Sequence, residues 1–189
     1  MPRRLCLAVA LLIGAHAPGA LAQAFTWSGA GSDGSWSTAA NWVGGVAPGS
    51  GNAIFLTFPT PAGRFDPSVP APWTVNRLAF AGPGTYALSG QAITFSGAAP
   101  SLSVAGNGHT IANDFFLSAG TLVVNDQALV LPGTITGPGF LSKAGAGTLT
   151  LSGAVESTDL RVTIGTLRIG DGAAGTIVNA PSVAIGGTF

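Results

Sequence analysis

Carboxylates are the first residues that could do chemistry, and the sequence spaces them singly. They are Asp33, Asp66, Asp114, Asp126, Glu156, Asp159 and Asp171. Acid–base cleavage of a glycosidic bond needs two carboxyl groups facing one substrate, and only Glu156 and Asp159 lie close in the chain. Asp114 and Asp126 each follow an asparagine, a pattern typical of turns closed by a local side-chain hydrogen bond. The alternative is that these two stack on neighbouring turns of a coil as calcium ligands; we expect the turn role.

Histidine and cysteine offer no second route to a reactive site. Cys6 and His16 lie within residues 1–22, which leaves His109 as the one histidine of the remaining chain. A lone histidine cannot form a histidine-only zinc site, and the preceding glycines predict that it lies in a loop. The chain contains no G-x-S-x-G motif after a strand and no Gly-Gly-x-Gly-x-Asp calcium repeat. We therefore expect a protein without catalytic residues, cofactor or metal.

Tryptophans form the one candidate contact surface. All four lie within residues 1–73, at Trp27, Trp36, Trp42 and Trp73. An indole ring could stack on a sugar and donate a hydrogen bond through its N–H. More often such residues close the exposed end of a core, and stacked β-repeats require such a cap. We expect capping.

Residues 1–22 have the layout of a secretory signal peptide. Arg3 and Arg4 precede an apolar run over residues 5–13 that is too short to span a bilayer. Small residues permit cleavage after Ala22 or after Ala24, and we favour Ala22. The mature chain then carries slightly more acidic than basic residues, which does not favour a nucleic-acid partner. It also loses Cys6, so no disulfide could block passage across an outer membrane.

Composition narrows the fold to the all-β class. The chain has 29 glycines and 13 prolines spread along its length, and these residues destabilise helix interiors by about 1 and 3 kcal/mol each. Disorder is not expected, because hydrophobic residues make up 47% of the chain although charged residues make up only 7%. Residues 23–73 are aromatic-rich and proline-rich, which suggests an N-terminal cap. Residues 74–189 alternate short strands, such as 74–80, 85–90 and 92–95, with glycine and asparagine turns.

This second region repeats itself loosely. Gly-Thr-Leu begins at Gly120, Gly147 and Gly165, and Gly-Thr-Ile begins at Gly133 and Gly175. Repeats of roughly 20 to 30 residues made of strands and glycine turns indicate the stacked turns of a β-solenoid. In such a coil the leucines of the run 148–151 would point inward and its threonines outward. A Greek-key sandwich is the alternative, because it also has short, closely spaced strands.

A family resemblance rests on the segment 143–154, KAGAGTLTLSGA, and on 162–170, VTIGTLRIG. Together they resemble the autotransporter-associated β-strand repeat, in which K-x-G-x-G-T-L-T-L-S-G is followed by a loop, a strand and G-T-L. The opening segment, with Trp27-Ser28-Gly29 and Asn41-Trp42, also resembles the start of such passenger proteins. The segment 155–159, VESTD, departs from the family's usual loop, and no translocator barrel follows.

The resemblance implies a right-handed parallel β-helix with an aromatic-rich N-terminal cap. It further implies a non-enzymatic, exported passenger at the surface of a Gram-negative cell, with an adhesive or surface-structural role. The expected partners are an outer-membrane translocator barrel, absent from this sequence, and a host or glycan surface; we interpret the chain as a truncated fragment. The alternatives are a carbohydrate-binding module that uses the tryptophans, and a β-helical polysaccharide lyase or hydrolase.

Overall fold

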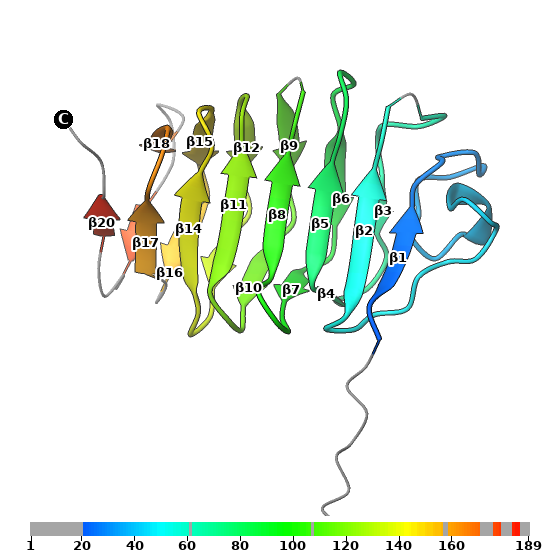
Figure 1. The fold of residues 1–189 in the computed structure, drawn as a ribbon, viewed down its shortest axis with the longest axis horizontal. Helices are drawn as coiled ribbons and strands as arrows, with labels where there is room; N and C mark the ends of the chain where they lie inside the picture. The colour runs from blue at the N-terminus through cyan, green and yellow to red at the C-terminus, as the bar shows by residue number, and fades with distance from the viewer. Residues whose placement is uncertain are drawn as a thin grey trace, which may run out of the picture.

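The chain winds into a parallel β-solenoid. The computed structural model describes residues 21–60, 62–106, 108–156, 159–170, 176–178 and 183–185, so nearly all of the expected signal peptide lies outside the described residues. In Figure 1 the front strands run upward, the chain returns behind them, and each turn advances from the β1 end toward the β20 end. This path makes the coil right-handed, and it confirms the fold class predicted from the sequence.

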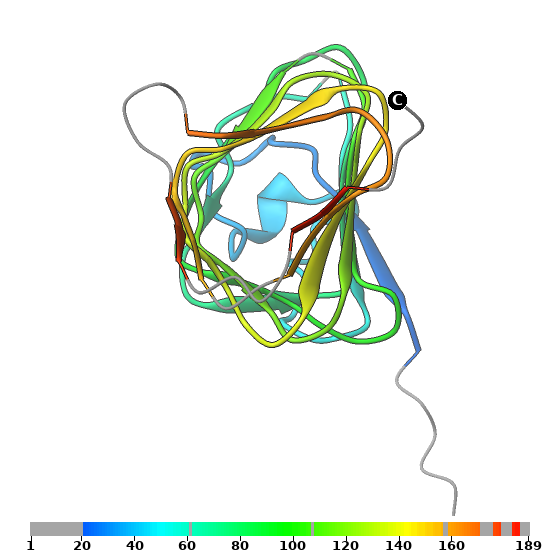
Figure 2. The same cartoon turned by 90° about the vertical axis from the view of Figure 1, so that its left-hand side faces the viewer.

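Three parallel sheets form the walls of the coil (Figure 2). The first sheet contains β1 (Gln23–Thr26), β2 (Ile54–Phe58), β5 (Arg77–Phe80), β8 (Ser101–Val104), β11 (Thr121–Asn125), β14 (Phe140–Ala144), β17 (Asp159–Val162) and β20 (Val183–Ile185). The second contains β4 (Trp73–Val75), β7 (Ile93–Phe95), β10 (Phe115–Leu117), β13 (Ile135–Thr136), β16 (Ala154–Glu156) and β19 (Thr176–Val178). The third contains β3 (Ser68–Val69), β6 (Ala87–Gly90), β9 (His109–Ile111), β12 (Leu129–Leu131), β15 (Thr148–Leu151) and β18 (Thr166–Ile169).

The core is built from inward columns in which one residue per turn stacks on the next. In the first sheet the column is Leu56, Leu78, Leu102, Val123, Lys143 and Val162. In the third sheet Leu149 and Leu151 are buried and the alternating Thr148 and Thr150 are half-buried, as alternation predicts. The Greek-key alternative is wrong, because sandwich strands pair antiparallel and the named strands of this coil pair in parallel.

Corners divide some runs that the sequence presents as continuous. The run 74–80 was expected to be one strand, but it is divided at Asn76 into β4 and β5, which belong to different sheets. Asn76 is buried, and its side-chain amide nitrogen donates to the carbonyls of Ser96 at 2.8 Å and Ala98 at 3.0 Å in the next turn. The corner is therefore held by bonds to residues about twenty positions away, which local alternation does not reveal.

The Gly-Thr-Leu segments mark the entry to strands in different sheets. Gly147 and Gly165 precede β15 and β18, which pair in the third sheet. Gly120 instead precedes β11 of the first sheet, and Gly133 precedes β13 of the second. The motif is therefore a corner-to-strand signal and not a fixed point in the turn, which explains its loose period.

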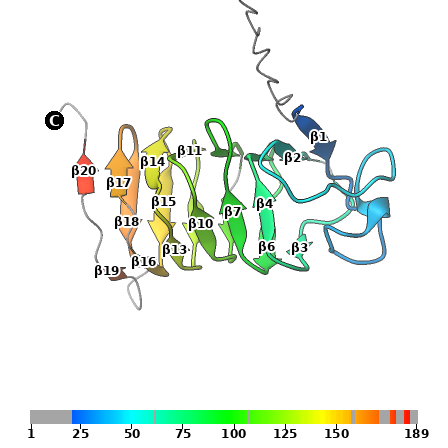
Figure 3. The same ribbon diagram turned by 90° about the horizontal axis from the view of Figure 1, so that it is seen from below.

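Beyond β1 the coil is closed by a loop and the short 3₁₀ helix Ala39–Asn41, which lie past β3 at the N-terminal end (Figure 3). Trp27, Trp36 and Trp42 are buried there and pack against Phe58 in tilted or edge-on contacts, with ring centroids 5.5 to 5.9 Å apart. The indole N–H of Trp42 donates to the Trp36 carbonyl at 2.8 Å, and that of Trp27 donates to the Arg64 carbonyl at 3.0 Å. The expected aromatic cap is therefore confirmed.

Candidate functional site

Glu156 ends β16 and Asp159 begins β17, whereas the other described carboxylates belong to separate segments of the coil. Asp33 lies in the cap loop, where hydrogen bonds from the Ser35 backbone N–H and the Thr38 hydroxyl lower the pKa of its carboxyl. The carboxylates of Asp66 and Asp159 lie 3.1 and 3.9 Å from the arginines two positions away in sequence. Within the described residues no group of three histidine, cysteine or acidic side chains could hold a metal ion; Asp171 lies outside them.

Asp114 and Asp126 differ in their surroundings. The carboxylate of Asp114 accepts a hydrogen bond of 2.7 Å from the backbone N–H of Thr134, which belongs to the following turn of the coil. The expectation of a local hydrogen bond within a β-turn was therefore wrong for Asp114. The N–H that it bonds precedes a strand in the next turn of the coil, 20 residues later in the chain. Asp126 lies at the end of β11, at a different corner, where its charge acts on the ammonium of Lys143.

His109 is a core residue and not the loop residue expected from its sequence neighbours. It begins β9 and points inward, and its ring stacks with Tyr86 at 5.9 Å. Its Nδ1 accepts a hydrogen bond of 3.0 Å from the Tyr86 backbone N–H, so the neutral ring carries its proton on Nε2. Nε2 is buried without a partner among the described residues. Burial lowers the pKa of His109, and the nearby Ala105 carbonyl opposes that shift.

The tryptophans do not form a platform for sugar rings. Trp27 and Trp36 have no exposed surface and Trp42 is 2% exposed. Trp73 is half-buried, and its N–H donates to the Gly49 carbonyl at 3.2 Å. Because stacking on a ligand needs an open ring face, three of the four side chains serve the cap and cannot reach a glycan.

Lys143 forms an unexpected polar site inside the coil. Its side chain occupies the column that holds Leu102 and Val123 in earlier turns, and it has no exposed surface. The ammonium donates to the backbone carbonyls of Ala144 at 2.9 Å, Gly145 at 2.6 Å and Ile164 at 3.1 Å. Its three donors are therefore all used. Burial lowers the pKa of Lys143, and the charge of Asp126 opposes that shift.

Glycines make room for this ammonium. A Cβ on Gly165 would lie 2.7 Å from Nζ of Lys143 and 2.2 Å from the Gly145 carbonyl oxygen. Gly145 itself has φ +84°, and a Cβ on Gly147 would lie 2.2 Å from the Gln127 carbonyl oxygen. The K-x-G-x-G part of the repeat motif is therefore one physical unit, in which a lysine bonds the carbonyls of a corner that only glycine can form this tightly.

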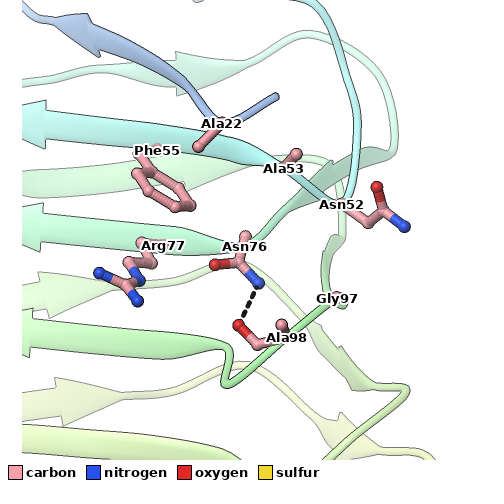
Figure 4. A pocket seen from close by; sticks show the side chains of 8 residues that line it. All are labelled: Ala22, Asn52, Ala53, Phe55, Asn76, Arg77, Gly97 and Ala98. Atoms are coloured by element: carbon pink, nitrogen blue, oxygen red, sulfur yellow. Dashed lines mark hydrogen bonds between the residues drawn. The ribbon is translucent and has the colours of Figure 1, made fainter. Parts of the chain in front are cut away.

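A second polar feature is a hollow of about 370 Å³ where strands of the first sheet begin (Figure 4). Successive corners of the coil supply its walls. The lining residues are Ala22, Asn52, Ala53, Phe55, Asn76, Arg77, Gly97 and Ala98. The guanidinium of Arg77 lies over the Phe55 ring at 4.7 Å from its centroid. None of these lining residues is acidic, so the electrostatic character of the hollow is positive.

No family model, curated protein or solved structure matched this chain. Along the described residues, no helix has the length and apolar character that a membrane span requires.

Sequence reasoning missed both polar features, for different reasons. In the sequence Lys143 stands out only as the first letter of a motif, although it shares the inward face of β14 with the buried Leu141. The hollow had no sequence signal at all, because Asn52, Asn76 and Gly97 come together only through the stacking of three turns.

Proposed function

We propose that the chain is a non-enzymatic passenger segment of the autotransporter type, exported to the cell surface or beyond, with an adhesive or surface-structural role. The observation that carries the proposal is the segment 143–153, whose resemblance to the passenger repeat coincides with a complete structural unit. Lys143 holds the corner by hydrogen bonds, the glycines permit it, and Leu149 and Leu151 join the buried columns of the third sheet. A coil of such units presents long outward faces on a rigid support.

The start of the first strand supports the preferred cleavage position. β1 begins at Gln23, directly after Ala22. Cleavage after Ala24 would remove Gln23 and Ala24, which pair with Ile54 and Phe55 of β2. Processing after Ala22 keeps the first strand whole, so this cut suits a folded, exported product better.

An outer-membrane translocator is the partner that this proposal requires for export from a Gram-negative cell. A host or glycan surface is the partner that the adhesive role requires, whereas nucleic acid is not expected. Asp66 and Asp159 pair with arginines, and glycosidic-bond cleavage needs two carboxyl groups facing one substrate, so this arrangement does not favour the lyase or hydrolase alternative. The buried tryptophans likewise do not favour the tryptophan-based glycan module.

The test uses the protein in its native cells. Intact cells are treated with a protease that cannot cross the outer membrane, and the remaining protein is detected with an antibody against the coil. We expect the protein to be degraded while a periplasmic marker survives, and mass spectrometry to find Gln23 at its N-terminus. Full protection from the protease in intact cells, with degradation after lysis, would refute surface exposure.

A further inference from the structure

We propose that the hollow beside Arg77 binds the carboxylate-bearing ring of an acidic sugar of the uronic acid type. The site goes beyond the proposed function, because it is built from the coil itself: Ala22 leaves with the signal peptide, and the other seven lining residues form the site of the mature chain. Its walls come from the starts of β2 and β5 and from the loop before β8, so it lies at the end of the first sheet where these strands begin (Figure 4).

Arg77 supplies the charge. The described residues form two ion pairs, Arg64–Asp66 and Arg161–Asp159, and Arg77 belongs to neither. Its guanidinium lies over Phe55, which restricts the side chain while leaving the N–H groups at the edge of the plane free to donate. A planar fork of donors matches a carboxylate through two parallel hydrogen bonds. The positive, acid-free lining therefore selects an anion.

The side-chain amides supply recognition of hydroxyl groups. The amide nitrogen of Asn76 is used in its bonds to Ser96 and Ala98, which fixes the side chain. Its oxygen points toward Arg77 in Figure 4 and can accept a hydrogen bond from a hydroxyl. Asn52 lies at the rim of the hollow, and its exposed side chain, which points away from Arg77 in Figure 4, can donate and accept there. A ligand with both a carboxylate and a hydroxyl satisfies Arg77 and Asn76, and Asn52 can contact a substituent of its ring at the rim.

The remaining lining suits a sugar ring. Ala53 and Ala98 present methyl groups, which can contact ring C–H groups. Gly97 has φ +89°, and a Cβ there would lie 2.1 Å from the Asn52 carbonyl oxygen, so the two corners approach each other through backbone alone. With Ala22 in place the hollow measures about 370 Å³, a volume that accommodates one small ring rather than a folded chain.

The test is an NMR titration of the ¹⁵N-labelled purified protein. The probes are the methyl glycoside of glucuronic acid, the methyl glycoside of glucose, and acetate. We expect the glucuronide to bind in the millimolar range with shifts at Asn76, Arg77, Gly97 and Ala98, and to bind at least tenfold more tightly than either other probe. Arg77→Gln should weaken glucuronide binding at least tenfold, and added salt should weaken it as well.

Arg168→Gln is the matched control, because Arg168 is an exposed arginine on the third sheet and its loss changes the net charge equally. The affinity of the Arg168→Gln protein for the methyl glucuronide should equal that of the parent protein. Asn52→Ala, which removes an exposed side chain, should weaken binding severalfold and gives a second readout if Arg77→Gln alters the fold. Equal binding of acetate and glucuronide, equal losses in Arg77→Gln and Arg168→Gln, or shifts confined to other residues would overturn the proposal.

Discussion

Replacing Lys143 by methionine tests whether the buried ammonium stabilises the coil. Methionine has a similar length and fits an apolar column, but it cannot donate to the carbonyls of Ala144, Gly145 and Ile164. Each buried carbonyl left without a donor costs about 1–3 kcal/mol. The substitution also removes a buried charge, and for a poorly solvated ion this removal stabilises the fold by several kcal/mol.

The three short hydrogen bonds decide between these opposing terms. Because these bonds surround the ammonium with backbone dipoles, removing the charge stabilises the fold only a little. The loss of the donor at three carbonyls should therefore dominate. We expect Lys143→Met to lower the free energy of unfolding by about 3 kcal/mol. For a chain of this size, that corresponds to a fall in Tm of about 6–12 °C.

Denaturant unfolding followed by circular dichroism measures the change, and Leu102→Met is the control in the same column. That exchange conserves volume and should cost less than about 1.5 kcal/mol. Hydrogen exchange at Thr163, whose N–H donates to the Lys143 carbonyl at 2.9 Å, localises the effect. A Lys143→Met protein as stable as the parent, or more stable, would show that the lysine is merely tolerated.

Three further predictions concern the core and the corners. Stability should fall as the pH drops below about 6.5, because the unfolded chain protonates His109 while burial lowers the pKa of His109 in the fold. His109→Asn should therefore reduce the pH dependence of the urea unfolding midpoint between about pH 5 and 7. Parallel pH profiles for the variant and the parent protein would contradict this. Trp42→Ala should lower the free energy of unfolding by about 3–5 kcal/mol, as measured by thermal unfolding. Val43→Ala, at a 65% exposed site, should lower it by less than about 0.5 kcal/mol. Similar losses in the two variants would argue against a stabilising cap. Gly145→Ala should destabilise the fold by about 2 kcal/mol more than Gly44→Ala. Both glycines have positive φ, but only at Gly145 would an added Cβ lie 2.5 Å from a carbonyl oxygen. Equal denaturant midpoints for the two variants would disprove the clash.

The sequence determines strand orientation well where local alternation agrees with polarity. In 148–151 the leucines alternate with threonines, so the inward face is evident from the run itself. His109 and Lys143 follow the same alternation as Ile111 and Leu141, but their polarity argues for the outside. Each is accepted inside because a backbone group from elsewhere bonds it, and such a partner is visible only in the fold.

Stacking register was the other unpredicted quantity. Successive inward residues of the first sheet are between 19 and 24 positions apart, because the corners vary in length. The corners that meet at the hollow beside Arg77 therefore have no constant spacing that a sequence pattern could detect. The cap was predictable in outline, since the tryptophans cluster within residues 1–73, but the burial of three of them required the closure of the loop over Phe58.

The ammonium of Lys143 couples two successive turns of the coil. Two of its acceptors are local, but the third, Ile164, lies 21 residues later in the following turn. Before that turn is laid down, the amine faces the open end of the coil and keeps its water. Dehydration of the lysine and docking of the next turn must then occur together. Lys143 therefore couples the folding of these two turns more tightly than apolar stacking alone would, within a coil whose stability is a sum of such neighbour interfaces.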